Sequence, residues 1–354
     1  EDSDSLTTRS MTITDSYHAP IYMSAAAMSR LGRGNAFSNN GNNAIETWNT
    51  TLYYSQTIRK QPVPYELLGG FSVEQGMQNA TTVITIEAGT VFWLRENASI
   101  DFNSQRLIAE GTADERITFA ASDPQKPWEA IYFGGAGSTA SNSILRYVTL
   151  RNGGGVDTLE ERLGGRGMID MYDLDGTPVA GPIMEHINIY GSTSYGIFMD
   201  LEDSDDTPPI LNNLTITGTT RAPLGMYVAA AGGLGTGSTF VDNEQNVIEI
   251  RAGTVVGGRM YYDQTWPKQP VPYKLVSDFG PLDVRDATLT IEPGNTILLE
   301  EGMGFRVGNG TMIADGTPTE PITFTRASEN AGQWGNILLE FNIDPPASFS
   351  YVNL

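Results

Sequence analysis

The chain contains two copies of one sequence pattern, about 204 residues apart. The segment TITDSYHAPIYMSAAA from Thr12 recurs as TITGTTRAPLGMYVAAA from Thr215, and YYSQTIRKQPVPYEL from Tyr53 recurs as YYDQTWPKQPVPYKL from Tyr261. Self-similarity of this kind is typical of architectures in which equivalent segments stack along one axis. We therefore divide the chain into a first unit, residues 1–214, and an incomplete second unit, residues 215–354, within one continuous rod.

The repeats are out of phase with the ends of the chain. The opening EDSDS resembles EDSDD from Glu202, so the first unit starts within a repeat, and no counterpart of residues 151–201 follows Leu354. We expect the chain to be a window of a longer tandem array. We also expect the strand around Tyr351 to Leu354 to lie on an open coil face, in register with the strand around Tyr147 to Leu150.

Within each unit the apolar residues alternate with polar ones over four to six positions, and each run ends at Gly, Asn or Pro. In LTIEPG, Leu289 and Ile291 face inward while Thr290 and Glu292 face water. This period predicts short strands rather than helices. The connections are too long for hairpins and too short and polar for packed helices, so the pattern favours a solenoid. About twelve coils of three strands would account for the length.

Two groups of segments carry a resemblance to a known family. ILNNLTITGTTRAPLGMYV from Ile210 and IMEHINIYGSTSYGIFMD from Ile183 resemble the repeat of right-handed parallel β-helix proteins, and LTIEPGNTILLEEGMGF resembles a pattern of large secreted or cell-surface bacterial β-helix proteins. The resemblance implies an all-β, right-handed parallel β-helix. It leaves function open, because this fold carries lyases, hydrolases, adhesins and passive stalks alike.

Composition excludes several classes of protein. The chain has 42 acidic and 21 basic side chains, a formal charge of -21, which repels nucleic-acid phosphates and anionic lipid surfaces. It has no cysteine, which excludes disulfides, thiolate catalysis and zinc–cysteine sites. No apolar run approaches the roughly 18 residues of a membrane helix. We expect neither nucleic-acid partners nor membrane insertion.

Two acidic segments are candidate calcium sites, because clustered carboxylates supply the oxygen ligands that this cation prefers. One precedes Gly176 within the longest excursion from the coil pattern, and the other recurs at the start of the chain. The candidate ligands are Asp170, Asp173, Asp175, Glu202, Asp203, Asp205 and Asp206. The alternative is that both segments are solvated connections. We expect no other cofactor.

A group of aromatic residues beside the two QPVPY segments is a candidate surface for glycan binding, because aromatic faces offer apolar area to sugar rings. It comprises Tyr53, Tyr54, Tyr261, Tyr262 and Trp266. Such residues also pack loops and proline turns, which is the structural alternative.

Repetition decides between two functional hypotheses. Catalysis needs one constellation of residues, whereas reach and multivalent attachment benefit from copies. We therefore favour a non-enzymatic extracellular or cell-surface rod with a structural or adhesive role, whose partners are a polysaccharide or a neighbouring repeat or surface protein. The alternative is a polysaccharide-acting lyase or glycoside hydrolase whose acidic site lies in the loop of residues 151–182.

Overall fold

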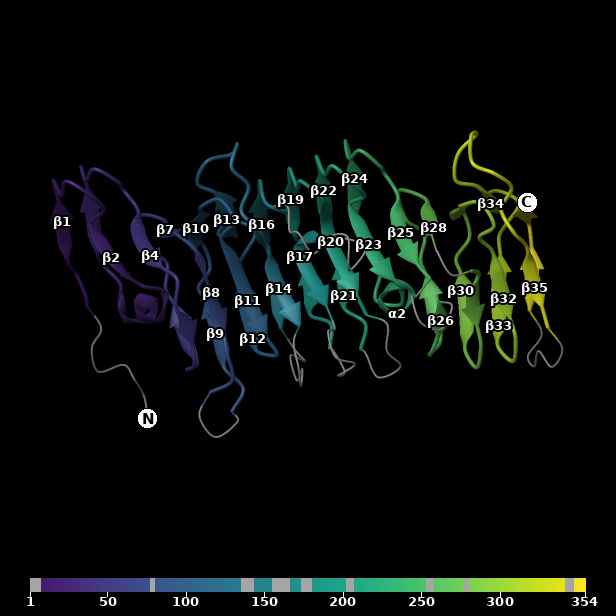
Figure 1. The fold of residues 1–354 in the computed structure, drawn as a ribbon, viewed down its shortest axis with the longest axis horizontal. Helices are drawn as coiled ribbons and strands as arrows, with labels where there is room; N and C mark the ends of the chain where they lie inside the picture. Colours follow the sequence, from purple (N-terminus) through teal and green to yellow (C-terminus); the bar gives the residue numbers. More distant parts are fainter. Residues whose placement is uncertain are drawn as a thin grey trace.

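The computed structural model describes residues 8–76, 80–134, 143–154, 166–172, 180–201, 207–252, 258–276, 280–340 and 347–354. In these residues nearly every regular element is a short strand, and each strand pairs with its neighbours in parallel. The strands form a parallel β-solenoid of about 11 turns, drawn as an elongated rod in Figure 1. The predicted all-β fold class is confirmed.

Successive strands enter successive sheets, and this order produces the coil. The strands β10 (Val91–Leu94), β11 (Ser99–Asn103) and β12 (Arg106–Glu110) belong to three different sheets. The next strand, β13 (Ile117–Ala121), returns to the first sheet and pairs with β10. A turn of this kind therefore consists of three strands joined at corners, and in two turns a short helix, η2 or α2, takes the place of one strand.

One sheet of twelve strands runs along most of the rod. Its strands in chain order are β5 (Thr51–Leu52), β8 (Gly70–Val73), β11, β14 (Ile131–Gly134), β17 (Gly167–Tyr172), β20 (Tyr195–Asp200), β23 (Leu224–Tyr227), β25 (Ile248–Arg251), β28 (Tyr273–Val276), β31 (Thr296–Leu299), β34 (Ile322–Arg326) and β37 (Val352–Asn353).

The second sheet has nine strands and the third has six. The nine are β2 (Ile21–Ser24), β4 (Ile45–Trp48), β7 (Tyr65–Leu67), β10, β13, β16 (Val148–Arg151), β19 (Asn188–Tyr190), β22 (Thr215–Thr217) and β24 (Thr239–Val241). The six are β6 (Gln56–Ile58), β9 (Val83–Ile86), β12, β15 (Ile144–Arg146), β18 (Ile183–Glu185) and β21 (Ile210–Asn212).

Smaller sheets complete the two ends of the rod. One pairs β1 (Thr12–Thr14) with β3 (Ala36–Ser38). The other two have four strands each: β26 (Arg259–Met260), β29 (Leu282–Val284), β32 (Phe305–Val307) and β35 (Ile337–Leu339), and β27 (Gln264–Trp266), β30 (Thr288–Ile291), β33 (Thr311–Asp315) and β36 (Ser348–Ser350). Two short helices, η2 (Ala25–Arg30) and α2 (Val228–Ala231), follow β2 and β23.

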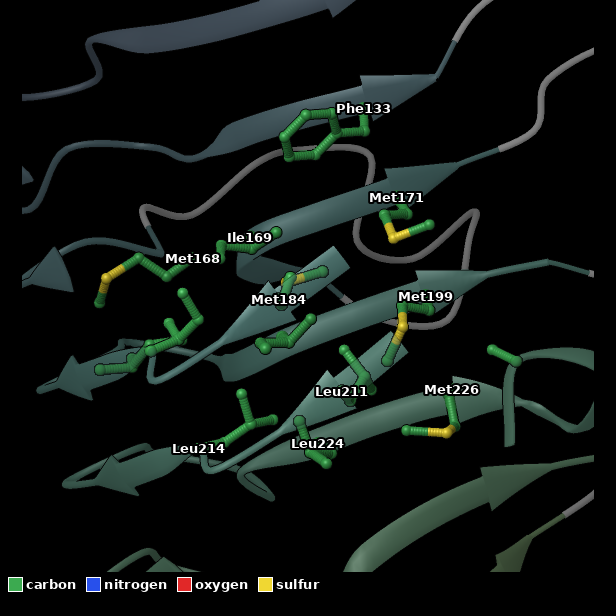
Figure 2. Packing of buried hydrophobic residues seen from close by; sticks show 14 of the residues in the cluster. Phe133, Met168, Ile169, Met171, Met184, Met199, Leu211, Leu214, Leu224 and Met226 are labelled. Atoms are coloured by element: carbon green, nitrogen blue, oxygen red, sulfur yellow. The ribbon is translucent and has the colours of Figure 1, made fainter. Parts of the chain in front are cut away.

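The core fills the inside of the coil with columns of apolar side chains. Alternate residues of a strand point to opposite faces, so one set from each strand points inward. In the twelve-stranded sheet, Met171, Met199 and Met226 occupy one such column on successive strands, and all three are fully buried (Figure 2). The parallel register stacks each inward residue on its equivalent in the next turn.

The same surface contacts occur in both units. Lys60 pairs with Glu115 at 2.7 Å, and Lys268 pairs with Glu320 at 2.6 Å. Each lysine packs over a glycine with positive φ, Gly89 in the first case. Equivalent sequence segments therefore adopt equivalent local structure.

The equivalent strands nevertheless lie in different sheets. The pairs β2 and β23, β4 and β25, and β10 and β31 begin 203 to 205 residues apart. The first member of each pair belongs to the nine-stranded sheet and the second to the twelve-stranded sheet. Both of these sheets continue across residues 214 and 215, where the sequence divides the units.

Candidate functional site

Outward-facing polar and aromatic side chains gather on the outer face of the twelve-stranded sheet, over β8, β11, β14 and β17. Asp101, Tyr132 and Asp170 are register partners on three successive strands. Their neighbours along each strand, such as Phe102 and Phe133, point into the core. We name this group the acid–tyrosine cluster. It comprises Glu74, Asp101, Glu129, Tyr132, Arg166, Asp170 and Tyr172.

Asp101 is an acid of the cluster with a raised pKa. The pKa of its carboxyl group is raised from 3.8 to about 6, chiefly by burial and then by the negative charges of Glu74 and Glu129. Its Oδ1 atom is buried without a hydrogen-bond partner in the part of the chain that the structure describes. Near neutral pH this carboxyl group is therefore able to exist in both protonation states.

The two tyrosines of the cluster are held in place by charged partners. The Tyr132 hydroxyl donates a hydrogen bond to Glu129 Oε1 at 2.7 Å, and its ring meets the Tyr172 ring edge to face at 6.0 Å. Burial raises the pKa of both phenols, so both remain protonated. Each is thus a hydrogen-bond donor next to a carboxyl group.

Arg166 supplies the positive charge of the cluster. Its guanidinium lies over the rings of Tyr132 and Tyr172, at 5.4 and 5.8 Å from their centroids. It also pairs with Asp170 at 3.4 Å, and Asp170 accepts a second hydrogen bond from the backbone N–H of Gly167. This buried ion pair holds the guanidinium against the two tyrosine rings.

The acid–tyrosine cluster is not repeated on the equivalent face of the second unit. There the positions of Asp101 and Tyr132 are taken by Arg306 and Leu338, which are register partners in the same way. Arg306 forms an ion pair with Glu340 at 2.8 Å. The scaffold therefore does not require the cluster, and titratable groups with shifted pKa values are typical of functional sites.

Of the predicted calcium ligands, only Asp170 lies within the described residues. Asp173, Asp175, Glu202, Asp203, Asp205 and Asp206 lie outside them. Asp170 is buried and engaged with Arg166 and Gly167. In the described ranges no group of three or more His, Cys, Asp or Glu side chains is placed to hold a metal ion. The calcium prediction stays a prediction.

The predicted aromatic group is divided by the fold. Tyr53 and Tyr54 are 50% and 67% exposed and line a hollow of about 120 Å³. Arg259 lies over the ring of Tyr261, and the Tyr262 hydroxyl donates a hydrogen bond to the Ala229 carbonyl. The group as a whole forms no single exposed ladder.

The prediction is wrong for Trp266, which lies in the core with no exposed surface and stacks on Tyr273 at 5.2 Å. Its ring cannot reach a ligand outside the rod. The equivalent residue of the first unit, Ile58, is also fully buried. That isoleucine was the sequence signal for an inward position.

Sequence reasoning missed Asp101 and a set of exposed aromatics on the nine-stranded sheet. Asp101 stands in IDF and Trp93 in FWL, each between two inward apolar residues. A polar or aromatic residue between two core residues of a strand points outward. The strand period could therefore have identified both.

No family model, no curated protein and no solved structure matches this chain. In addition, no helix in the described part of the chain is long and apolar enough to cross a membrane.

Proposed function

We propose that the chain is an extracellular or cell-surface rod with a structural and adhesive role. The observation that carries this proposal is the recurrence of the same contacts in two successive lengths of one solenoid. Beyond Lys60 and Lys268, the Tyr65 hydroxyl donates to the Arg59 carbonyl at 2.8 Å, and the Tyr273 hydroxyl donates to the Pro267 carbonyl at 2.7 Å. Repetition of a scaffold extends reach and multiplies attachment points.

Antibody labelling of intact producing cells tests the location. We expect labelling without permeabilisation, and labelling that appears only after permeabilisation would contradict the proposal. Incubation with neutral and uronate polysaccharides tests the non-enzymatic role. We expect no release of oligosaccharides from either class of polysaccharide, and sustained release would contradict the non-enzymatic role.

The acid–tyrosine cluster favours a second candidate function, a polysaccharide-acting hydrolase or lyase. Proton transfer to a leaving oxygen needs an acid whose pKa lies near the working pH, and Asp101 is such a group. Residues 151–182 contribute Arg166, Asp170 and Tyr172 to the cluster. Under this candidate, Asp101→Asn abolishes oligosaccharide release while Asp114→Asn, at an exposed position, retains it. Equal release by the two variants would exclude Asp101 from the chemistry.

A further inference from the structure

Three exposed aromatic residues lie on the outer face of the nine-stranded sheet near the N-terminal end of the rod. Tyr22 is 61% exposed on β2, Trp48 is 38% exposed on β4 and Trp93 is 36% exposed on β10. The rings of Tyr22 and Trp48 lie 4.7 Å apart at an interplanar angle of 46°. They form a tilted apolar surface open to solvent.

Polar side chains separate this ring pair from Trp93. The register runs Tyr22, Glu46, Glu66, Trp93 across four successive strands, β2, β4, β7 and β10. At a strand spacing of about 4.8 Å, the row spans about 14 Å along the rod. We name Tyr22, Glu46, Trp48, Glu66 and Trp93 the aromatic platform.

The floor of the platform is a connected hydrogen-bond network. Asn42 donates to Glu46 Oε1 at 2.9 Å and to Glu66 Oε2 at 2.7 Å, and Arg95 Nε donates to Glu66 Oε1 at 2.8 Å. The carboxylates are thereby fixed in position between the two aromatic ends. A ligand that fits would alternate apolar faces with hydroxyl groups.

The second unit shows that the fold does not need these aromatics. The residues equivalent to Tyr22, Trp48 and Trp93 are Gly225, Arg251 and Leu298. The ion pair of the floor persists with its charges exchanged, because Lys274 and Glu300 replace Glu66 and Arg95 and pair at 2.8 Å. The scaffold is therefore kept while the aromatic surface is confined to the first unit.

We propose that the aromatic platform binds a neutral glycan chain that lies along the rod axis. Sugar rings stack on the Tyr22–Trp48 pair and on Trp93, and their hydroxyl groups donate hydrogen bonds to the partly exposed Glu46, which the buried Glu66 network holds in place. The two carboxylates and the formal charge of -21 repel uronate and sulfated chains. Glu46 and Glu66 interrupt the apolar surface between the two aromatic ends. A protein partner is disfavoured because protein interaction sites tend to be continuous apolar patches. This inference rests on the adhesive role proposed above and names its ligand class.

Calorimetric titration of the full chain tests the inference. The probes are cellohexaose, mannohexaose and xylohexaose, with hexagalacturonate as the charged counterpart. We expect binding of at least one neutral hexaose and none of hexagalacturonate. Trp48→Arg and Trp93→Leu should each weaken that binding about tenfold. Both variants introduce the residue that the second unit carries at the equivalent position, so they should fold normally.

Val241→Ala is the matched control, because Val241 is 47% exposed on the outer face of the same sheet but far along the rod. It should leave binding unchanged. Failure of every neutral hexaose to bind would overturn the inference, as would binding that Trp48→Arg and Trp93→Leu leave intact or that Tyr54→Ala alone removes. Self-association abolished by the two tryptophan variants would identify the platform as a contact between copies and would also overturn it. The cell-labelling result does not depend on any of these outcomes.

Discussion

At the scale of single residues, Asp101 links the acid–tyrosine cluster to the stability of the rod. Its pKa of about 6 in the folded protein lies above the ordinary value of 3.8, so the folded state binds this proton more tightly than the unfolded chain does. The resulting stabilisation is complete below about pH 4 and is lost as the pH rises through about 6. Asp101→Asn imitates the protonated acid and should remove this dependence.

The measurement is urea unfolding of the wild type and of Asp101→Asn between pH 4 and 8. The free energy of unfolding of the variant, relative to that of the wild type, should rise by about 2 kcal/mol from pH 4 to pH 8. This value is discounted for partial exposure of the side chain. Asp114→Asn is the control for loss of one charge at an exposed position. A difference between wild type and Asp101→Asn that stays constant with pH would show that Asp101 is not perturbed in this way.

Sequence alone identified the inward residues of the strands more reliably than the residues of the sites. Leu289 and Ile291 are buried as the alternation predicts, because a strand with one face in the core has only one permissible register. The prediction for Trp266 was wrong because tryptophan occurs both in cores and on binding surfaces, so the residue type alone does not place it. The raised pKa of Asp101 comes first from its burial and then from Glu74 and Glu129. All three depend on the packing of neighbouring turns, which the local sequence does not show.

At the scale of elements, the column of methionines tests how tightly successive turns are coupled. Met199 of β20 lies between Met171 of β17 and Met226 of β23, with no exposed surface (Figure 2). Met199→Ala should lower the free energy of unfolding by about 3 kcal/mol, because it leaves a cavity between two turns. Val241→Ala, at an exposed position, should cost less than about 0.5 kcal/mol. Equal losses in the two variants, measured by urea unfolding, would mean that the column is not closely packed.

The strands were predictable as elements, whereas the sheet that each one joins was not. A strand such as β30 follows from the alternation in TLTI. The assignment of β4 to one sheet and of its equivalent β25 to another depends on how many corners the chain has turned between them. The helices η2 and α2 arise from AAAMSR and VAAA, where small residues fit a tight turn at a corner. Their sequences carry no amphipathic period that would predict a helix.

We also predict an effect of calcium on stability, from the two acidic segments that are candidate calcium sites. If the carboxylates of Asp173, Asp175 or of the segment from Glu202 to Asp206 bind this cation, millimolar calcium should raise the melting temperature, because a ligand that prefers the folded state stabilises it. Magnesium at the same concentration is the control, since its smaller ion demands a stricter geometry. Equal melting temperatures with the two cations would exclude a calcium site in these segments.

At the scale of the whole molecule, the repeat and the coil are not in phase. Equivalent strands of the two units move from the nine-stranded to the twelve-stranded sheet, and consecutive strands visit three sheets in turn. One unit therefore advances the chain by a whole number of turns plus about one third of a turn. An array of such units would present equivalent surfaces on three sides of the rod. A repeat in phase with the coil would instead present its equivalent surfaces on a single face.

We expect molecules of residues 1–354 to associate through the turn that contains β35, β36 and β37. Among the described strands, β35, β36 and β37 each lie at the edge of a sheet and pair with one neighbour. Unpaired strand edges bearing apolar side chains template pairing with another chain. The exposed apolar residues of this turn are Leu338, Leu339, Phe349, Tyr351 and Leu354. Sedimentation equilibrium should therefore show association that increases with protein concentration.

The doubly substituted variant Leu338→Lys, Leu339→Lys should weaken this association, because charges on an edge strand oppose pairing with a second edge. Val241→Lys adds a lysine at a similarly exposed position away from this turn and should leave the association unchanged. Both variants should melt within a few degrees of the wild type, since none of the three side chains is buried. A monomer at every concentration, or an association that the two lysines leave unchanged, would show that the turn of β35, β36 and β37 does not bind a second copy.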